Sequence, residues 1–268
     1  MNYIVVPEEI ITDPDELVLA LYIYACIKAG LDGIVDINFG NLVLWYGKIL
    51  NRRKSCFTYK FVSTLNKLAH ECNYDYFEFD DEQLDFISQL ETLPPSDLAE
   101  TTISIKVNRY KPALYDCYAF LYIDEIAKIV NWYRMSLHSP SNQSSSSPSI
   151  FSIFKVLCYI RMKIKSKRDG EETGYAEVYD GIAAELGLSR QTVSKITNLL
   201  NYWSDEHILP AFYVSHPISY VSSPAARDGK KYTRYATTFY PSYKREFNKD
   251  KRIIVEVKLP PPNLNTCC

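Results

Sequence analysis

One stretch of the sequence, from Gly181 to Asn201, decides the fold: GIAAELGLSRQTVSKITNLLN. Apolar side chains recur at helical spacing on both sides of Gly187, which predicts two short helices joined by a turn. Glycine suits such a turn because it adopts positive φ angles at little cost. Ser189 suits the N-cap of the second helix because its hydroxyl can accept a hydrogen bond from a main-chain amide one turn later.

The second helix of the pair, predicted over 190–203, has two chemically different faces. At about 100° per residue the apolar side chains gather on one side, which predicts a face buried in the core. These side chains are Val193, Ile196, Leu199, Leu200 and Trp203. The N-cap and the opposite side supply only polar and basic groups: Ser189, Arg190, Gln191, Ser194, Lys195, Asn198 and Asn201. Such groups bond to base edges and phosphates, and no acid interrupts the helix. The pattern favours DNA contact over an ordinary helical corner.

The segment IAAELGLSRQTVSKI resembles the helix-turn-helix signature of bacterial DNA-binding proteins. The resemblance places Ala184 at the small position of the first helix, Gly187 at the turn, and Val193 and Ile196 at buried positions of the recognition helix. Two strand-like segments follow, LPAFYVSHPISYV and KYTRYATTFY, and extend the resemblance to a winged helix. In that family the wing tip touches DNA, a role that would fall to Arg227, Lys230, Lys231 and Arg234. The alternative for these four is a solvated loop.

Charge is divided unequally along the 268 residues, whose formal net charge is -2. Residues 1–150 carry 12 Lys and Arg against 20 Asp and Glu, whereas residues 151–268 carry 18 against 12. The net charge changes from negative to positive at the segment HSPSNQSSSSPS (138–149), whose composition is that of a linker. Only the second half attracts polyanions. The predicted organisation is an acidic N-terminal winged-helix-like domain over 1–137, a Ser-rich linker over 138–149, a basic winged-helix DNA-binding domain over 150–258 and a disordered tail over 259–268.

The two halves have the same predicted order of elements, which indicates a duplicated unit. In the second half a helix, a strand, two helices and a hairpin are expected at about 150–166, 175–178, 179–186, 190–203 and 209–240. In the first half a helix is expected at about 14–29, a turn and strand in GLDGIVDINF, and helices at about 40–46 and 53–70. Strand-like YDYFEFD and TTISIKV follow, and IDEIAKIVNWYRM is expected to close the half as a helix. The predicted fold class is mainly α with small β-hairpins (α+β), arranged as two winged-helix domains in tandem.

DNA contact by the first half is a weaker prediction. Its third helix has a polar side and a basic lead, NRRKS, at its N-terminus, where positive charge opposes the helix dipole and favours a phosphate partner. The candidate contacts are Arg52, Arg53, Lys54, Tyr59, Lys60 and Ser63, with Thr64, Asn66 and Lys67 on the same side. The presumed wing, however, is acidic and should avoid DNA: Asp75, Glu78, Asp80, Asp81, Glu82 and Asp85. Protein–protein contact is therefore the rival interpretation.

Over its whole length the chain resembles replication initiators and replisome organisers of plasmids, phages and integrative elements. The resemblance rests on the tandem architecture and on the opening VPEEIITDPDELVLALYIYACIKAG. It implies binding to origin sites on double-stranded DNA, self-association as a homodimer, and recruitment of helicase-loading proteins. A transcriptional regulator is the alternative, as is an adaptor that its second half tethers to DNA.

Signals for catalysis are sparse. Four histidines form no paired metal-binding motif, and neither a phosphate loop nor a dinucleotide fingerprint is present. We therefore expect no enzymatic activity, catalytic residue, metal or cofactor. Seven cysteines without a CxxC pair, most of them in apolar helical runs, favour the reducing cytoplasm. No signal peptide is indicated, and the apolar run at 17–27 is too short to cross a membrane.

Overall fold

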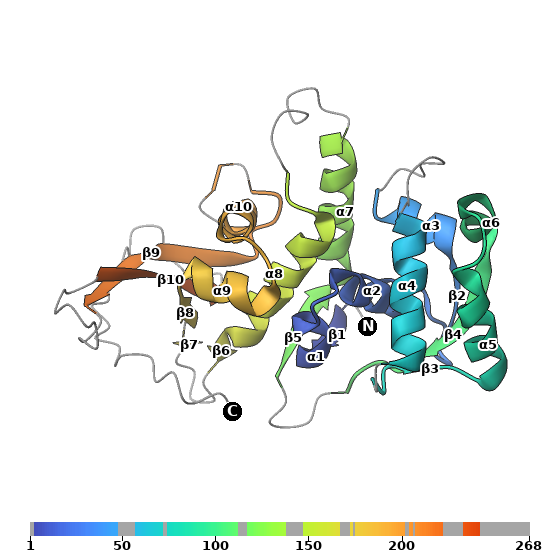
Figure 1. The fold of residues 1–268 in the computed structure, drawn as a ribbon. Coiled ribbons are helices and arrows are strands. Elements are labelled where there is room, and N and C mark those ends of the chain that lie inside the picture. The colour runs from blue at the N-terminus through green and yellow to red at the C-terminus, as the bar shows by residue number, and fades with distance from the viewer. Residues whose placement is uncertain are drawn as a thin grey trace, which may run out of the picture.

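The structure is a computed structural model of mixed α+β class, in agreement with the predicted class (Figure 1). It combines helices with small antiparallel sheets. The residues that it describes are 3–47, 57–71, 74–111, 117–137, 147–166, 172–173, 175–201, 204–205, 207–221 and 233–241.

The first half contains a three-stranded sheet whose strand order is β2-β4-β3. Both strand pairs are antiparallel, and β4 lies in the middle although it comes last in the chain. Asn38 ends β2 and caps the next helix, because its side chain accepts a hydrogen bond from the amide of Asn41 at 2.9 Å. The elements are α2 (Glu16–Lys28), β2 (Ile34–Asn38), α3 (Phe39–Trp45), α4 (Phe57–His70), β3 (Phe77–Glu78) and β4 (Thr102–Val107).

The second half repeats this order of elements. Its sheet has the strand order β8-β10-β9, so the last strand is again central. The elements are α8 (Ile150–Lys163), β8 (Tyr175–Glu177), α9 (Tyr179–Leu186), α10 (Arg190–Leu200), β9 (Phe212–Val221) and β10 (Thr233–Pro241). A small pair, β6 (Lys165–Ser166) with β7 (Glu172–Thr173), lies between α8 and β8 in the chain. One topology therefore occurs twice.

The acidic segment of the first half is not the wing that the sequence analysis expected. Two helices, α5 (Asp81–Leu90) and α6 (Pro95–Glu100), lie between β3 and β4. Asp80 and Gln83 form a capping box, in which each side chain bonds the other residue's amide at 2.8 Å. Ile87 and Leu90 are fully buried. The predicted acidic wing is wrong for Asp81, Glu82 and Asp85, because the cap and the apolar face make this stretch helical; Asp75 lies in a turn and Glu78 in β3.

Further elements surround this repeated unit in the first half. Strand β1 (Tyr3–Pro7) pairs antiparallel with β5 (Tyr118–Tyr122), and we call this two-stranded sheet the β1–β5 ribbon. Helix α1 (Glu8–Thr12) follows β1, and helix α7 (Ile123–Leu137) follows β5. The amide of Glu8 donates to the carbonyl of Cys117 at 3.1 Å, which joins the ends of the two strands.

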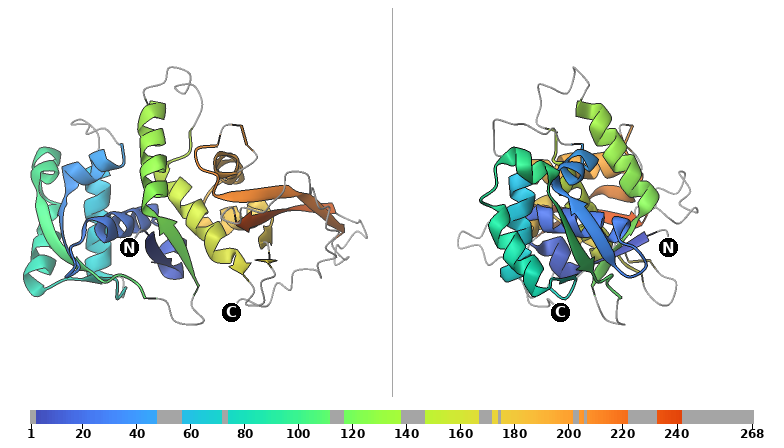
Figure 2. Two further views of the ribbon diagram at one scale, coloured as in Figure 1. Left: turned by 180° about the vertical axis from the view of Figure 1, so that it is seen from behind. Right: turned by 90° about the vertical axis from the view of Figure 1, so that its right-hand side faces the viewer.

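Helix α8 connects the two halves. In Figures 1 and 2 it lies between the first-half helices and the β8–β10–β9 sheet. It packs against α1, α2 and β5 of the first half and against α10 of the second. Phe151 of α8 lies with its ring centroid 5.1 Å from that of Tyr46 and 5.9 Å from that of Phe61. Buried side chains of both halves therefore belong to one continuous core.

Candidate nucleic-acid interface

The turn between α9 and α10 is formed by Gly187, as the sequence predicts. Its φ of 65° is left-handed, a conformation in which a Cβ would meet the following carbonyl oxygen. The amide of Leu188 reaches back to the carbonyl of Ala183 at 2.9 Å, which closes the end of α9. Three residues, Gly187 to Ser189, therefore separate α9 from α10.

The start of α10 is capped by Ser189. Its hydroxyl accepts a hydrogen bond from the amide of Thr192 at 3.1 Å, which satisfies one of the amides left free in the first helical turn. The predicted N-cap is therefore confirmed.

The apolar side of α10 is buried as predicted. Val193, Ile196 and Leu200 have no exposed surface, and Leu199 is half-buried. The helix ends at Leu200 and not at the predicted 203, and Trp203 lies outside the described residues. On α9 the buried small residue is Ala183, at 5% exposure, whereas Ala184 is exposed. The assignment of Ala184 to the small position is thus wrong by one residue. A helix turns by about 100° per residue, so adjacent alanines point in different directions and only one of them faces the partner helix.

The polar side of α10 faces outward. Ser189, Arg190, Gln191, Lys195 and Asn198 are exposed, and Ser194 is half-buried. The predicted place of Asn201 on this side is wrong, because α10 ends at Leu200 and the half-buried Asn201 side chain accepts from the amide of Val214 at 3.3 Å. Arg190 lies 3.8 Å from Asp180 of α9, and both side chains are 69% exposed. An ion pair so open to water contributes little to stability, which leaves the guanidinium available to a stronger anion. The sequence analysis did not foresee this pair.

A hollow of about 230 Å³ lies at the N-terminal end of α10. Its lining combines hydroxyl groups, an amide and an ammonium group, and no carboxylate belongs to it among the described residues. The lining residues are Ser147, Pro148, Ser149, Ser152, Leu188, Ser189, Gln191, Thr192 and Lys195. The hydroxyls of Ser149 and Ser152 donate to the carboxylate of Glu16, at 3.3 and 2.8 Å, so an acid lies directly against two of the lining residues.

The predicted wing contacts are placed only in part. Arg227, Lys230 and Lys231 lie outside the described residues. Arg234 lies in β10, where its backbone pairs with that of Tyr220 in β9, and its side chain is also outside what the structure describes.

In the first half, α4 differs from α10 in what surrounds its polar side. Lys60 and Ser63 are exposed, as predicted. Tyr59, however, donates its hydroxyl hydrogen to the carbonyl of Leu93 at 2.8 Å, so the α5–α6 connection holds it. Thr64 is buried and donates to the carboxylate of Asp15; its predicted place on the outward side is wrong because α2 packs against this part of α4. Arg52, Arg53 and Lys54 lie outside the described residues.

A hollow of about 490 Å³ lies beside α4, and acids line it together with the basic residues. Lys67 lies 3.4 Å from Asp13. Carboxylates in such a place repel phosphates, so α4 is poorer than α10 as a nucleic-acid surface. The lining residues are Asp15, Leu17, Lys60, Ser63, Thr64, Asn66, Lys67, Glu71 and Glu91.

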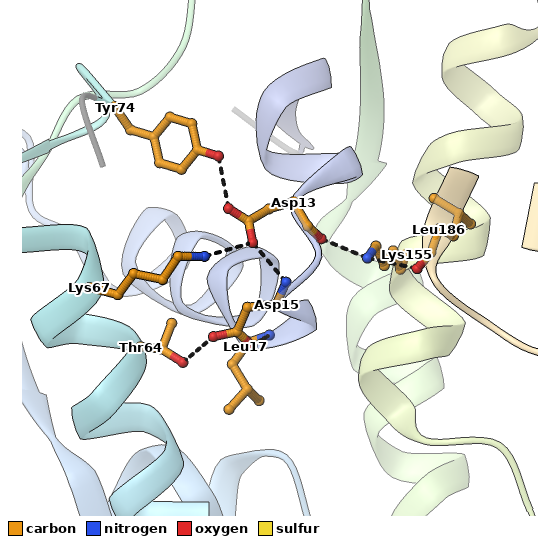
Figure 3. Close-up of polar contacts among 8 residues, drawn as sticks. All are labelled: Asp13, Asp15, Leu17, Thr64, Lys67, Tyr74, Lys155 and Leu186. Atoms are coloured by element: carbon orange, nitrogen blue, oxygen red, sulfur yellow. Dashed lines mark hydrogen bonds and ion pairs between the residues drawn. The ribbon is translucent and has the colours of Figure 1, made fainter. Parts of the chain in front are cut away.

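A buried lysine, Lys155, bonds main-chain carbonyls of both halves, a role that was not predicted from the sequence. It is 1% exposed, and its ammonium donates to the carbonyl of Asp13 at 2.6 Å and to that of Leu186, the last residue of α9, at 3.0 Å (Figure 3). On the same segment Asp13 also accepts from Lys67 and from the hydroxyl of Tyr74. A lone lysine inside the apolar run IFSIFKVLCYI was the available signal.

Comparison with known proteins adds no identity: no protein-family model, no curated protein and no solved structure matches this chain. Two further observations concern membrane spans and metal sites. No described helix combines the length and apolar content needed to span a membrane. In the described parts of the chain, no three His, Cys, Asp or Glu side chains converge as metal ligands would.

Proposed function

We propose that this protein binds double-stranded DNA in a sequence-specific manner and is not an enzyme, with α10 as the recognition helix. The observation that carries the proposal is the exposed side of α10, where Arg190, Gln191, Lys195 and Asn198 lie. The helix contains no acidic residue. Arg and Gln are the side chains that bond guanine and adenine in the major groove, and Lys and Ser bond phosphates.

The repeated topology supports two winged-helix units in tandem. In each half a helix, a strand, two helices and two strands follow one another, with the last strand central in the sheet. We assign the second unit to DNA. The acid-lined hollow beside α4 and the inserted helices α5 and α6 favour protein contact for the first unit.

Among sequence-specific DNA-binding proteins, we propose first a replication initiator or replisome organiser of a mobile element, and second a transcriptional regulator. The acidic helices inserted between β3 and β4 would also suit an adaptor that binds another protein through its first unit. Buried Cys26 and Cys158 suit a reducing cytoplasm: burial raises the pKa of each thiol to about 12, so neither is a reactive thiolate at neutral pH.

The test is recovery of genomic DNA fragments by the full-length protein at about 0.15 M salt, followed by sequencing. We expect enrichment of one recurring site, and its loss in Arg190→Ala/Gln191→Ala. The matched control is Lys60→Ala/Ser63→Ala at exposed positions of α4, which should keep the site. Retention of all fragments equally would reduce α10 to a nonspecific basic surface, and no retention would refute DNA binding. A site at an origin, with a helicase loader bound, would favour replication over a promoter-binding regulator.

A further inference from the structure

Five aromatic side chains lie in a row on the first half, although they come from three distant segments of the chain. We call Tyr76, Tyr110, Tyr118, Phe120 and Tyr3 the aromatic row. Successive ring centroids in this order are 5.7, 6.5, 5.2 and 5.0 Å apart. Tyr3 and Phe120 are 37% and 38% exposed, and the other three are half-buried. Water therefore reaches part of every ring.

The β1–β5 ribbon supplies three of these rings. Ala119 and Leu121 of β5 are buried, and Tyr118 and Phe120 alternate with them. Because side chains alternate along a strand, these two rings lie on the outer face of the ribbon. In the view from behind in Figure 2, β5 lies on the near side of the molecule, beside α8. A sheet face open to water normally carries polar side chains, so rings in their place indicate a surface that binds an apolar group.

The spacing of the rings suits a proline-rich segment in the polyproline II conformation. That helix rises about 3.1 Å per residue, so prolines two positions apart are separated by about 6 Å, close to the distance between successive rings. Proline-rich segments bind surfaces lined by aromatic side chains, and the preformed helix loses little conformational entropy on binding.

The charges at the Tyr76 end of the row are acidic. Glu9 accepts a hydrogen bond from the Tyr76 hydroxyl at 2.8 Å, and Asp75 precedes Tyr76 in the chain. Both carboxylates are exposed, and the exposed Lys111, which follows Tyr110, offsets only one of them. Carboxylates repel the phosphates of a nucleic acid and attract a basic side chain. The expected ligand is therefore a proline-rich segment with a basic residue at one end.

The chain itself contains a segment of this kind. Lys258 and Leu259 are followed by Pro260, Pro261 and Pro262, the one run of three prolines in the sequence. Residues 242–268, which include the tail predicted over 259–268, lie outside the described residues. Lys258 stands two positions before the first proline, which matches the carboxylates at one end of the row.

This segment is long enough to reach the row. Strand β10 ends at Pro241, and Pro260 follows 19 positions later, which allows a span of up to about 60 Å. Two elements lie between β10 and the ribbon. β10 pairs with β8, Tyr175 of β8 has its ring centroid 6.2 Å from that of Tyr159 of α8, and α8 packs against β5. A helix is about 10 Å across and paired strands are about 5 Å apart, so the distance is well below the available span.

We propose that residues 258–262 of this chain, Lys-Leu-Pro-Pro-Pro, bind the aromatic row. The prolines pack between the rings, and the ammonium of Lys258 lies beside Glu9 and Asp75. A tethered segment has an effective concentration of about 1 mM, so it occupies the row even when the contact by itself is weak. The proposal is independent of DNA binding by α10.

The experiment is fluorescence anisotropy of a labelled synthetic peptide with the sequence of residues 256–266. The peptide is titrated with the full-length wild type and with the full-length variant Pro260→Ser/Pro261→Ser/Pro262→Ser, whose own segment no longer competes. We expect the serine variant to bind the peptide at least ~10-fold more tightly than the wild type. This ratio follows from an effective concentration of about 1 mM and a dissociation constant of about 0.1 mM or below.

The rings are tested in the serine variant. Adding Tyr118→Thr/Phe120→Thr should weaken peptide binding at least ~10-fold, because threonine keeps the strand and removes the rings. The matched control is Phe86→Ala, which removes a ring that is 39% exposed on α5 and should leave peptide binding unchanged. Circular dichroism identifies any variant that is unfolded. A peptide with alanine in place of the three prolines should not bind, and this measurement does not depend on the folding of a ring variant.

Three outcomes would overturn the proposal. The first is that the serine variant does not bind the peptide. The second is that the ring substitutions leave peptide binding unchanged. The third is that the wild type and the serine variant bind the peptide equally well and both need the rings, because the row would then serve a proline-rich segment of another protein.

Discussion

The ammonium of Lys155 in the second half donates a hydrogen bond to the main-chain oxygen of Asp13 in the first half, 2.6 Å away. Burial of this lysine lowers its pKa, and the nearby carboxylates of Glu16, Asp13 and Asp15 raise it again. The second bond, to Leu186, is made at the C-terminal end of α9, where the helix dipole favours a cation. The contact therefore holds the C-terminal end of α9 in the second half against the first half.

Replacing Lys155 by methionine is expected to destabilise the protein by about 1–3 kcal/mol. Two buried carbonyls lose their donor, and the relief of a buried charge offsets this only in part. Chemical denaturation followed by circular dichroism measures the change. The control is Lys163→Met on the same helix: this side chain is 30% exposed and forms surface ion pairs, so its loss should change stability by less than about 0.5 kcal/mol. Equal effects of the two substitutions would contradict the role of Lys155.

Gly187→Ala should cost about 1–2 kcal/mol of stability through backbone strain alone. Beyond its two chain neighbours, a Cβ at this position would meet no residue within 4 Å, but the φ of 65° brings that Cβ close to the residue's own carbonyl oxygen. Gly187→Asn should cost less, because asparagine tolerates the left-handed region better than alanine does. Thermal melts of both variants check the order, and an alanine variant as stable as the wild type would show that the turn relaxes to another conformation.

Asn198→Asp should weaken binding to all DNA sequences alike. It places a carboxylate on the exposed side of α10, where phosphates are expected, without altering the buried side of the helix. Fluorescence anisotropy with specific and random duplexes measures the loss. Asn66→Asp on α4 is the control and should have little effect. If Asn66→Asp weakens binding as much, the first unit contacts DNA as well.

Lys195→Ala should reduce the slope of log affinity against log salt by about 1, because one phosphate contact is lost. Binding of a specific duplex is measured over a salt series for the wild type and the variant. Lys60→Ala on α4 provides the comparison and should keep the wild-type slope. An unchanged slope for Lys195→Ala would remove this residue from the phosphate contacts.

Stability should fall as the pH rises above about 10. Burial raises the pKa of Tyr22, Tyr46, Tyr159 and Tyr175 above the ordinary value of 10.0, so the unfolded chain loses these protons first and is favoured at alkaline pH. The contribution of these tyrosines to the free energy of unfolding is complete below pH 10 and is lost as the pH rises from there through their folded pKa values. Lys155 has the opposite sign, because its folded pKa is lowered, but it is one group against these tyrosines and the buried thiols of Cys26 and Cys158, whose pKa values are also raised. Denaturation midpoints together with tyrosinate absorbance test this, and native-state titration of all tyrosines near 10 would contradict it.

Local signals were sufficient where each element is specified by its own residues. The Ser189 cap, the Gly187 turn and the apolar period of Val193 and Ile196 predicted α9 and α10 from sequence, because caps, turns and amphipathic faces depend on neighbours within a few positions. The same reasoning failed between β3 and β4. There acidic residues suggested a loop, whereas the Asp80–Gln83 capping box and buried Ile87 specify a helix.

By itself, the sequence determined the class of fold, the repeated order of elements and the polar side of α10. Only the tertiary structure decided which of the predicted polar side chains are exposed to solvent. Thr64 is buried against Asp15, Tyr59 is held by Leu93, and Lys155 reaches Asp13 across a long separation in the chain. These contacts join distant segments, and helical or strand periodicity gives no information about which segments meet. The pairing of β1 with β5 was decided in the same way.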